Sequence, residues 1–207
     1  MLDHLEVWLA VRDSVPWNDV TAHLDGPVPA TRDGYLRHAC GDERLLAAYR
    51  DVRREAAAGA ALTPRLTARW NSIVRGVPGT AFRRGTAVAK NGRERYGLHA
   101  VTEQRFASCL EETADPATPV ASRAARAYLD VAFFHPYDDG NGRLAGLVLL
   151  FVLLRERVEL DEVTPILTTI RRADDADGAA DLARLVYGIA AATGRRHIRE
   201  SASANGV

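Results

Sequence analysis

The chain of 207 residues is poor in several residue types, and each scarcity argues against a class of protein. It has two cysteines, Cys40 and Cys109, which form no CxxC pair. We therefore expect free, buried thiols in a reducing compartment rather than a disulfide framework or a thiolate metal site. Aromatic residues make up only 7% of the chain and alanine is abundant, which favours helices over sheets.

Positive charge is not in excess either. The chain has 27 basic and 27 acidic residues, so its formal net charge is zero. Because proteins that grip nucleic acid through its phosphates are usually basic, we expect no nucleic-acid partner. The longest apolar run, Leu147 to Leu154, is too short to cross a bilayer, and the N-terminus does not resemble a signal peptide. We expect a soluble, cytoplasmic protein with no membrane partner.

The length of the chain allows one sizeable domain with an extension. We predict an N-terminal extension over residues 1–40, a main domain over 41–195 and a flexible tail over 196–207. In the extension, the spacing of Leu5, Trp8 and Arg12 predicts a short helix that ends before Pro16. This extension is expected to pack against the main domain.

Apolar residues recur at helical spacing through most of the main domain, which predicts a mainly α fold. Thr63 followed by Pro64 is typical of a helix start, and Thr102 is a second candidate cap. The predicted helices cover residues 42–58, 63–76, 102–113, 119–134, 142–157, a segment beginning at 164, and 182–191.

One β element stands out among these helices. Two short extended runs, 86–90 and 93–98, flank Asn91-Gly92. Asn-Gly in this setting predicts a hairpin, because both residues tolerate positive φ. From the residues alone, a surface hairpin without function is as good an interpretation as a functional one.

A polar, glycine-rich loop with the sequence HPYDDGNGR, residues 135–143, lies between two strongly apolar helices. Glycines let backbone N–H groups approach an anion closely, and the helix start adds unpaired donors and a favourable dipole. Arg143 adds a planar cation whose donors match a phosphate. The second half of the loop is therefore a candidate anion-binding site.

His135 and Asp139 add reactive groups to this loop. The ordinary pKa of histidine is near neutrality, so His135 could accept a proton from a hydroxyl. Magnesium bound to phosphates typically takes one or two protein carboxylates, and Asp139 could supply one. Taken singly, the histidine could merely end a helix and the Asp-Gly-Asn-Gly stretch could merely turn. Together, these residues are what transfer of a phosphoryl-containing group to a hydroxyl requires.

The nine residues resemble the signature of the Fic/Doc family, His-Pro-Phe-x-(Asp/Glu)-Gly-Asn-Gly-Arg, with Tyr137 in place of phenylalanine. The hairpin, preceded by Phe82-Arg83, resembles the family's flap, and the resemblance extends over residues 42–185. It implies that residues 41–195 form a Fic domain, a helical bundle with one β-hairpin flap. It also implies transfer of AMP, or another nucleotide monophosphate, from a nucleoside triphosphate such as ATP to a Ser, Thr or Tyr hydroxyl of a protein.

The resemblance also implies a role for each residue of the loop. His135 corresponds to the catalytic base and Asp139 to the Mg²⁺ ligand, while Tyr137 anchors the loop in the core. The flap, residues 85–98, would hold a target protein by strand addition. The phosphate-binding group would consist of Gly140, Asn141, Gly142 and Arg143.

Two departures from the family pattern concern the transferred group and its control. The signature usually continues to a second arginine, which helps to orient the terminal phosphates, but this chain has Gly146 there. The Doc branch lacks that arginine and transfers the γ-phosphoryl group, so Doc-like transfer is an alternative. A catalytically weak module that only binds a nucleotide or a partner is another, although His135 and Asp139 argue against it. No Glu-Gly or Glu-Asn dipeptide of the family's inhibitory helix occurs, so we include a separate inhibitory protein among the candidate partners.

Overall fold

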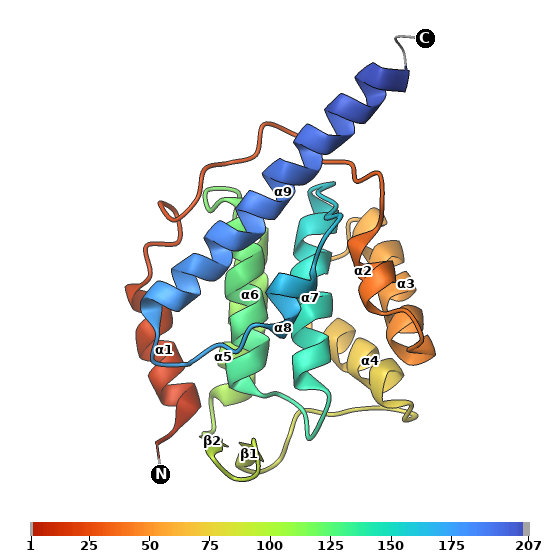
Figure 1. The fold of residues 1–207 in the computed structure, drawn as a ribbon. Helices are drawn as coiled ribbons and strands as arrows, with labels where there is room; N and C mark the ends of the chain where they lie inside the picture. The colour runs from red at the N-terminus through yellow and green to blue at the C-terminus, as the bar shows by residue number, and fades with distance from the viewer. Residues whose placement is uncertain (1, 205–207) are drawn as a thin grey trace.

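Two antiparallel helices form the centre of the molecule in the computed structural model, which describes residues 2–204. They are α6, Val120–Phe134, and α7, Asn141–Arg155. Every residue of α7 from 144 to 153 is buried. A helix that is apolar on all sides belongs in a core, which explains why the other helices surround this pair (Figure 1). The mainly helical bundle with one β-hairpin that was predicted from the sequence is confirmed.

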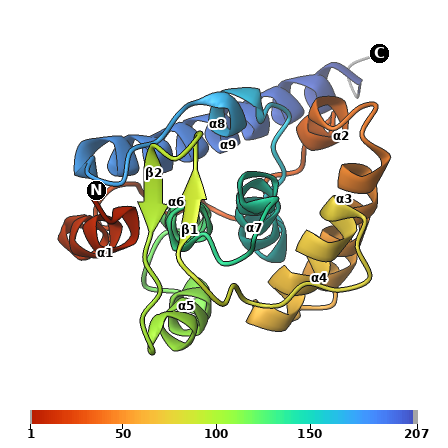
Figure 2. The same cartoon turned by 90° about the horizontal axis from the view of Figure 1, so that it is seen from below.

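The surrounding helices cover different sides of the central pair. On the α7 side lie α3, Glu43–Ala57, and α4, Pro64–Arg75, while α9, Ala176–Ala204, crosses α6 (Figure 2). Both α3 and α4 begin where the sequence predicts, because Asp42 and Thr63 each accept a backbone N–H of the first turn. The remaining helices are α1 at His4–Ser14, α2 at Gly34–His38, α5 at Thr102–Glu111, a 3₁₀ turn at Glu112–Ala114, and α8 at Thr164–Thr168.

The N-terminal segment is joined to the bundle through a buried polar contact. In α1, Arg12 and Trp8 both donate hydrogen bonds to the carboxylate of Asp130 in the middle of α6, at 2.7 and 3.0 Å. Asp130 is fully buried. Because a buried carboxylate without a partner is costly, this arrangement fixes α1 on α6.

The predicted hairpin is present at the lower end of the bundle (Figures 1 and 2). Strand β1, Ala87–Ala89, pairs antiparallel with β2, Glu94–Tyr96, and Ala89 lies opposite Glu94. The connection therefore has four residues, 90–93, rather than the two of a tight Asn-Gly turn. Lys90 itself has positive φ and leaves the ladder, which makes the strands shorter than expected.

Three local expectations are wrong. Thr102 is not a helix cap, because its hydroxyl accepts the N–H of His99 while α5 begins without a side-chain cap. Cys109 is buried as expected, but Cys40 is exposed in the turn after α2. Residues 196–204, which were assigned to a flexible tail, belong instead to α9, which continues to Ala204. Arg196 in this part of the helix pairs with Asp161. The end of the predicted tail, 205–207, lies outside the described residues.

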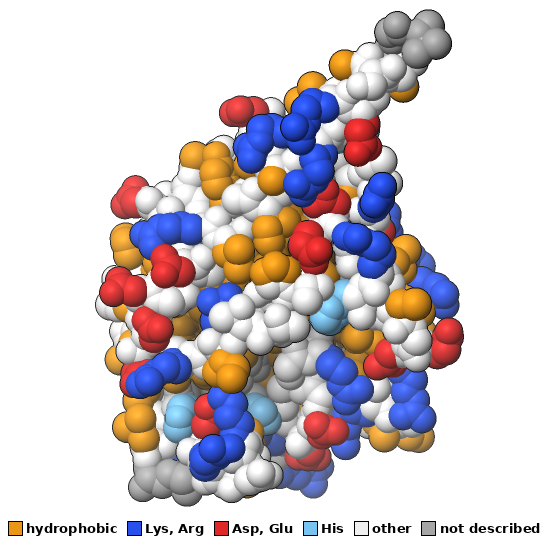
Figure 3. All heavy atoms as spheres, viewed as in Figure 1, with side chains coloured by type: hydrophobic (Ala, Val, Ile, Leu, Met, Phe, Trp, Pro, Cys, Tyr) orange, Lys and Arg blue, Asp and Glu red, His pale blue; other side chains and the backbone are white. Residues whose placement is uncertain are grey.

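Basic and acidic side chains are interspersed over the face shown in Figure 3. Among residues 2–204, no helix is both long and apolar enough to cross a membrane.

Candidate active site

The loop between α6 and α7 is bounded by two residues with left-handed backbone. His135 ends α6 with φ 48° and ψ 55°, and Gly140 precedes α7 with φ 79°. A Cβ atom at position 140 would also lie only 2.9 Å from Nδ2 of Asn71 in α4. Glycine is therefore required there both by the backbone angle and by the close approach of α4.

The inner side of the loop is fixed by buried hydrogen bonds. The Asn141 side chain accepts the backbone N–H of Tyr137 at 3.0 Å and donates to its carbonyl at 2.7 Å. The Tyr137 hydroxyl lies 2.7 Å from Oγ1 of Thr67, and Asn71 donates to the carbonyl of Asp139 at 2.9 Å. The loop is thereby tied to itself and to α4, and Tyr137 lies in the core as expected.

The outer side of the loop is open. Asp139, Gly142 and Arg143 are exposed, and a Cβ atom added at Gly142 would meet nothing within 4 Å. No side chain of residues 2–204 caps α7, so the first N–H groups of this helix have no intrahelical acceptor. Asp139 accepts the N–H of Gly140 at 2.6 Å through one carboxylate oxygen. These groups suit an anionic ligand with an associated cation.

His135 lies partly buried beside the flap. Its imidazole stacks on the Tyr96 ring of β2 with centroids 4.5 Å apart and an interplanar angle of 13°. Burial, with the nearby Arg83 guanidinium, lowers the pKa of His135 below 6.5, although a hydrogen bond to the Ala132 backbone opposes this shift. The imidazole is therefore mostly neutral at pH 7 and can accept a proton.

Arg83 connects the flap to the end of α6. Its buried guanidinium donates to the carbonyl of Gly97 after β2, to that of Gly85 before β1, and to that of Phe134. Its own backbone N–H donates to the carbonyl of Pro136 at 2.9 Å. Both ends of the flap are therefore held next to the loop that carries His135.

Gly146 is covered by α8. A Cβ atom at this position would lie 2.8 Å from Cδ2 of Leu167. Arg143 turns to the other side of α7, where Nη1 is 3.5 Å from the carbonyl of Val74 in α4. Although residues 143 and 146 are three apart in one helix, the structure gives them different neighbours.

Residues 71–153 match the model of the Fic/DOC family. Over these residues, which carry the flap and the loop, the chain is similar to this family. A Fic domain-containing signaling protein from Bacteroides thetaiotaomicron VPI-5482 has a similar fold, with a TM-score of 0.50 at 16% identity and 93% of each chain covered. A Fic family protein from Desulfovibrio desulfuricans G20 aligns with a TM-score of 0.48 and 18% identity, over 98% of this chain and 64% of that one. No protein in the curated set matches the chain.

The site residues predicted from the sequence lie on both sides of the loop. His135, Asp139, Gly142 and Arg143 keep accessible polar groups, whereas the side chain of Asn141 is used inside the loop. From the sequence alone, no site role was predicted for Tyr96, Thr67 or Asn71. Their contacts join segments far apart in the chain, and the only sequence signal was that Tyr96 lies in the predicted hairpin.

Proposed function

We propose that this chain is a Fic-type protein adenylyltransferase, which moves AMP or another nucleotide monophosphate from a nucleoside triphosphate to a Ser, Thr or Tyr hydroxyl. Similarity to the family supports transferase chemistry in general. The observation that carries the proposal is the arrangement of the loop: a largely neutral imidazole at one end and an open, uncapped helix start with Arg143 at the other. As the reaction would consume ATP, we expect it to take place in the cytoplasm.

ATP and Mg²⁺ fit the residues on the outer side of the loop. The space in front of Gly142 is open, so phosphate oxygens could accept the free N–H groups of α7. Arg143 would add a charge-assisted contact. The exposed carboxylate of Asp139 would be a ligand of Mg²⁺, which favours oxygen donors and offsets phosphate charge when bound.

In the proposed reaction, His135 accepts the proton of the target hydroxyl. The hydroxyl oxygen then forms a bond to the α-phosphorus of ATP while the bond from that phosphorus to the bridging oxygen breaks, releasing pyrophosphate. The N–H groups of Gly142 and its neighbours and the Arg143 guanidinium would stabilise the charge on the phosphates.

The flap, residues 85–98, offers a place for the target protein. Among the described residues, β1 pairs only with β2, so its other edge is free for strand addition. Figure 2 places β1 on the side of α7 and β2 on the side of α1. A target strand paired with β1 would therefore lie near the loop. A proline scan of residues 86–90 should lower target modification, because proline removes N–H donors; modification that survives every substitution would exclude strand addition.

Doc-like transfer of the γ-phosphoryl group is the second candidate. The contact of Leu167 with Gly146 favours it, because an arginine at 146 would first have to displace the end of the Leu167 side chain. A module that only binds a nucleotide or a partner is the third. We also keep a separate inhibitory protein as a proposed partner, since the sequence lacks the inhibitory glutamate motif.

ATP labelled at either the α- or the γ-phosphate would distinguish these functions. The purified chain would be incubated with Mg²⁺ and lysate proteins, and His135→Ala would serve as the inactive control. We expect transfer of the α-label. Transfer of the γ-label alone would identify a kinase-like reaction, and no transfer despite ATP binding would indicate the binding module.

A further inference from the structure

Tyr96 connects the flap to the loop through its aromatic ring. The ring is 3% exposed, and one face stacks on the imidazole of His135. His4 of α1 lies 5.7 Å from the Tyr96 ring, tilted by 49°. The Tyr96 hydroxyl donates to Glu94 at 2.6 Å, and Glu94 in turn pairs with Lys90 at the flap tip. The position of this ring is therefore determined by three separate segments.

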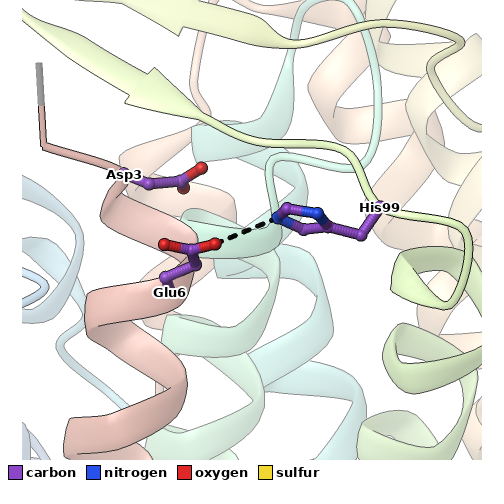
Figure 4. A group of neighbouring side chains, drawn as sticks. All are labelled: Asp3, Glu6 and His99. Atoms are coloured by element: carbon purple, nitrogen blue, oxygen red, sulfur yellow. Dashed lines mark ion pairs between the residues drawn. The ribbon is translucent and has the colours of Figure 1, made fainter.

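The α1 side of this arrangement is held by a cluster of Asp3, Glu6 and His99 (Figure 4). Asp3 accepts the N–H of Gly97 at 3.0 Å and contacts Arg95 at 3.3 Å, while Glu6 pairs with His99 at 3.2 Å. Because both carboxylate oxygens of Asp3 are engaged within the protein, the cluster fastens β2 to α1. On the opposite side, Arg83 fastens the same strand end to α6.

Among the aromatic rings of residues 2–204, that of Tyr96 is the one that stacks on the imidazole of His135. His135 ends α6 and begins the loop, and its imidazole lies within hydrogen-bonding reach of the Ala132 backbone. A single hydrogen bond leaves rotation about that bond open, whereas a nearly parallel ring on one face removes it. The charged groups around the imidazole, Arg83, Glu94 and Asp139, act on it through their charge and supply no aromatic ring.

We infer that Tyr96 is a positioning residue of the transfer reaction: its ring holds the imidazole of His135 in the orientation that accepts the target's proton, and thereby couples the flap to the base. The inference rests on the proposed function. It implies that a target bound to the flap and the base that deprotonates it keep a fixed position relative to each other. Misplacement of a catalytic group by about 1 Å can cost on the order of 10²-fold in rate, so a loss of stacking should be measurable.

Two substitutions test this inference. Tyr96→Phe keeps the ring and removes the hydroxyl, whereas Tyr96→Leu keeps apolar bulk and removes the ring. We expect Tyr96→Leu to lower kcat for target modification at least tenfold, with Kd for ATP within twofold of the unaltered protein. Tyr96→Phe should retain most of kcat. Tyr49→Leu, which removes a buried tyrosine of α3 that bonds to Asp33, controls for general loss of packing.

An NMR measurement detects the stacking of Tyr96 on His135 independently of transferase activity. In the unaltered protein without ligand, the ring protons of His135 should be shifted upfield by the Tyr96 ring current relative to those of exposed His23. The shift should persist in Tyr96→Phe and vanish in Tyr96→Leu. Absence of the shift in the unaltered protein, or full kcat in Tyr96→Leu, overturns the inference. If the shift is present and follows the ring but no variant, including the unaltered chain, transfers label, the proposed function fails while the contact stands.

Discussion

The two sides of the loop over residues 135–143 differ although they belong to one short segment. On the inner side, Tyr137 and Asn141 are 1% and 2% exposed, and their polar atoms are hydrogen-bonded within the protein. On the outer side, Asp139, Gly142 and Arg143 face solvent. The first group determines the shape of the loop, and the second is free to meet a ligand. A substitution on the inner side should therefore lower stability, whereas a substitution on the outer side should affect ligand binding or chemistry.

His135→Ala is expected to have the largest effect on chemistry. Removing a positioned general base typically costs 10²-fold or more in rate, so transfer should fall by about that factor or further. ATP affinity should change little, because the groups proposed to bind phosphate lie at the other end of the loop. Label transfer measures the expected loss of rate, and calorimetric titration with ATP measures the affinity. His23→Ala, an exposed histidine near the start of α6, should behave like the unaltered protein; a His135→Ala variant with full activity would refute the mechanism.

Arg143→Ala and Asp139→Ala should come next. A hydrogen bond to a charged group is worth about 1.5–3 kcal/mol, so Arg143→Ala should weaken ATP binding by roughly 10- to 100-fold. Asp139→Ala should remove the Mg²⁺ dependence of that binding. Melting temperatures should change little, because both side chains are exposed. Asp138→Ala and Arg199→Ala are the matched controls. Unchanged ATP affinity in both test variants would mean that the nucleotide binds elsewhere.

On the inner side of the loop, the expectation that Tyr137 lies in the core is confirmed, whereas the anion site on the outer side stays a prediction. Gly140 to Arg143 could be assigned to an anion site because glycines and a helix start have this property whatever surrounds them. The hydrogen bonds between the Asn141 side chain and the Tyr137 backbone could not be predicted, because they depend on the path of the loop backbone. Likewise, nothing in the spacing of α9 reveals that Arg196 meets Asp161, 35 residues earlier, and that the helix continues past it.

Asn141→Ala tests the inner side. The substitution leaves the buried N–H and carbonyl of Tyr137 without their partners, and an unsatisfied buried group costs about 1–3 kcal/mol. Urea unfolding should show this loss as a lower midpoint with an unchanged m-value. The companion variant Gly142→Ala should keep or slightly raise stability, by up to about 1 kcal/mol, because alanine favours helices. It should nevertheless weaken ATP binding, since the methyl group enters the open space. Equal stability losses in both variants would abolish the distinction between the two sides.

The pH dependence of transfer follows from the burial of His135. Its pKa is lowered, so the imidazole stays neutral and competent as a base to a lower pH than an exposed histidine. The acid limb of the rate profile should therefore have its midpoint below 6.5. Because the folded protein resists protonation there, this group should also reduce stability as pH falls below the unfolded pKa. A midpoint above 6.5 in the kinetic profile would assign the limb to another group.

Gly146→Arg should have the smallest effect on binding, although this position lies one turn from Arg143. In the sequence, an arginine here would restore the second arginine of the Fic signature, and residues three apart lie on one face of a helix, which would turn it toward the phosphates. The structure places Leu167 of α8 against position 146, so the new side chain must first displace it. We expect ATP affinity to stay within about threefold and stability to fall by about 1–3 kcal/mol, the usual cost of overpacking. The double variant Gly146→Arg/Leu167→Ala removes the obstacle and should bind ATP more tightly than Leu167→Ala alone. Thermal melts and ATP titrations on the three variants distinguish obstruction by Leu167 from Doc-like binding, in which we expect ATP to lie in the opposite orientation. In that orientation the arginine would meet no terminal phosphate, and the double variant would bind ATP no more tightly than Leu167→Ala.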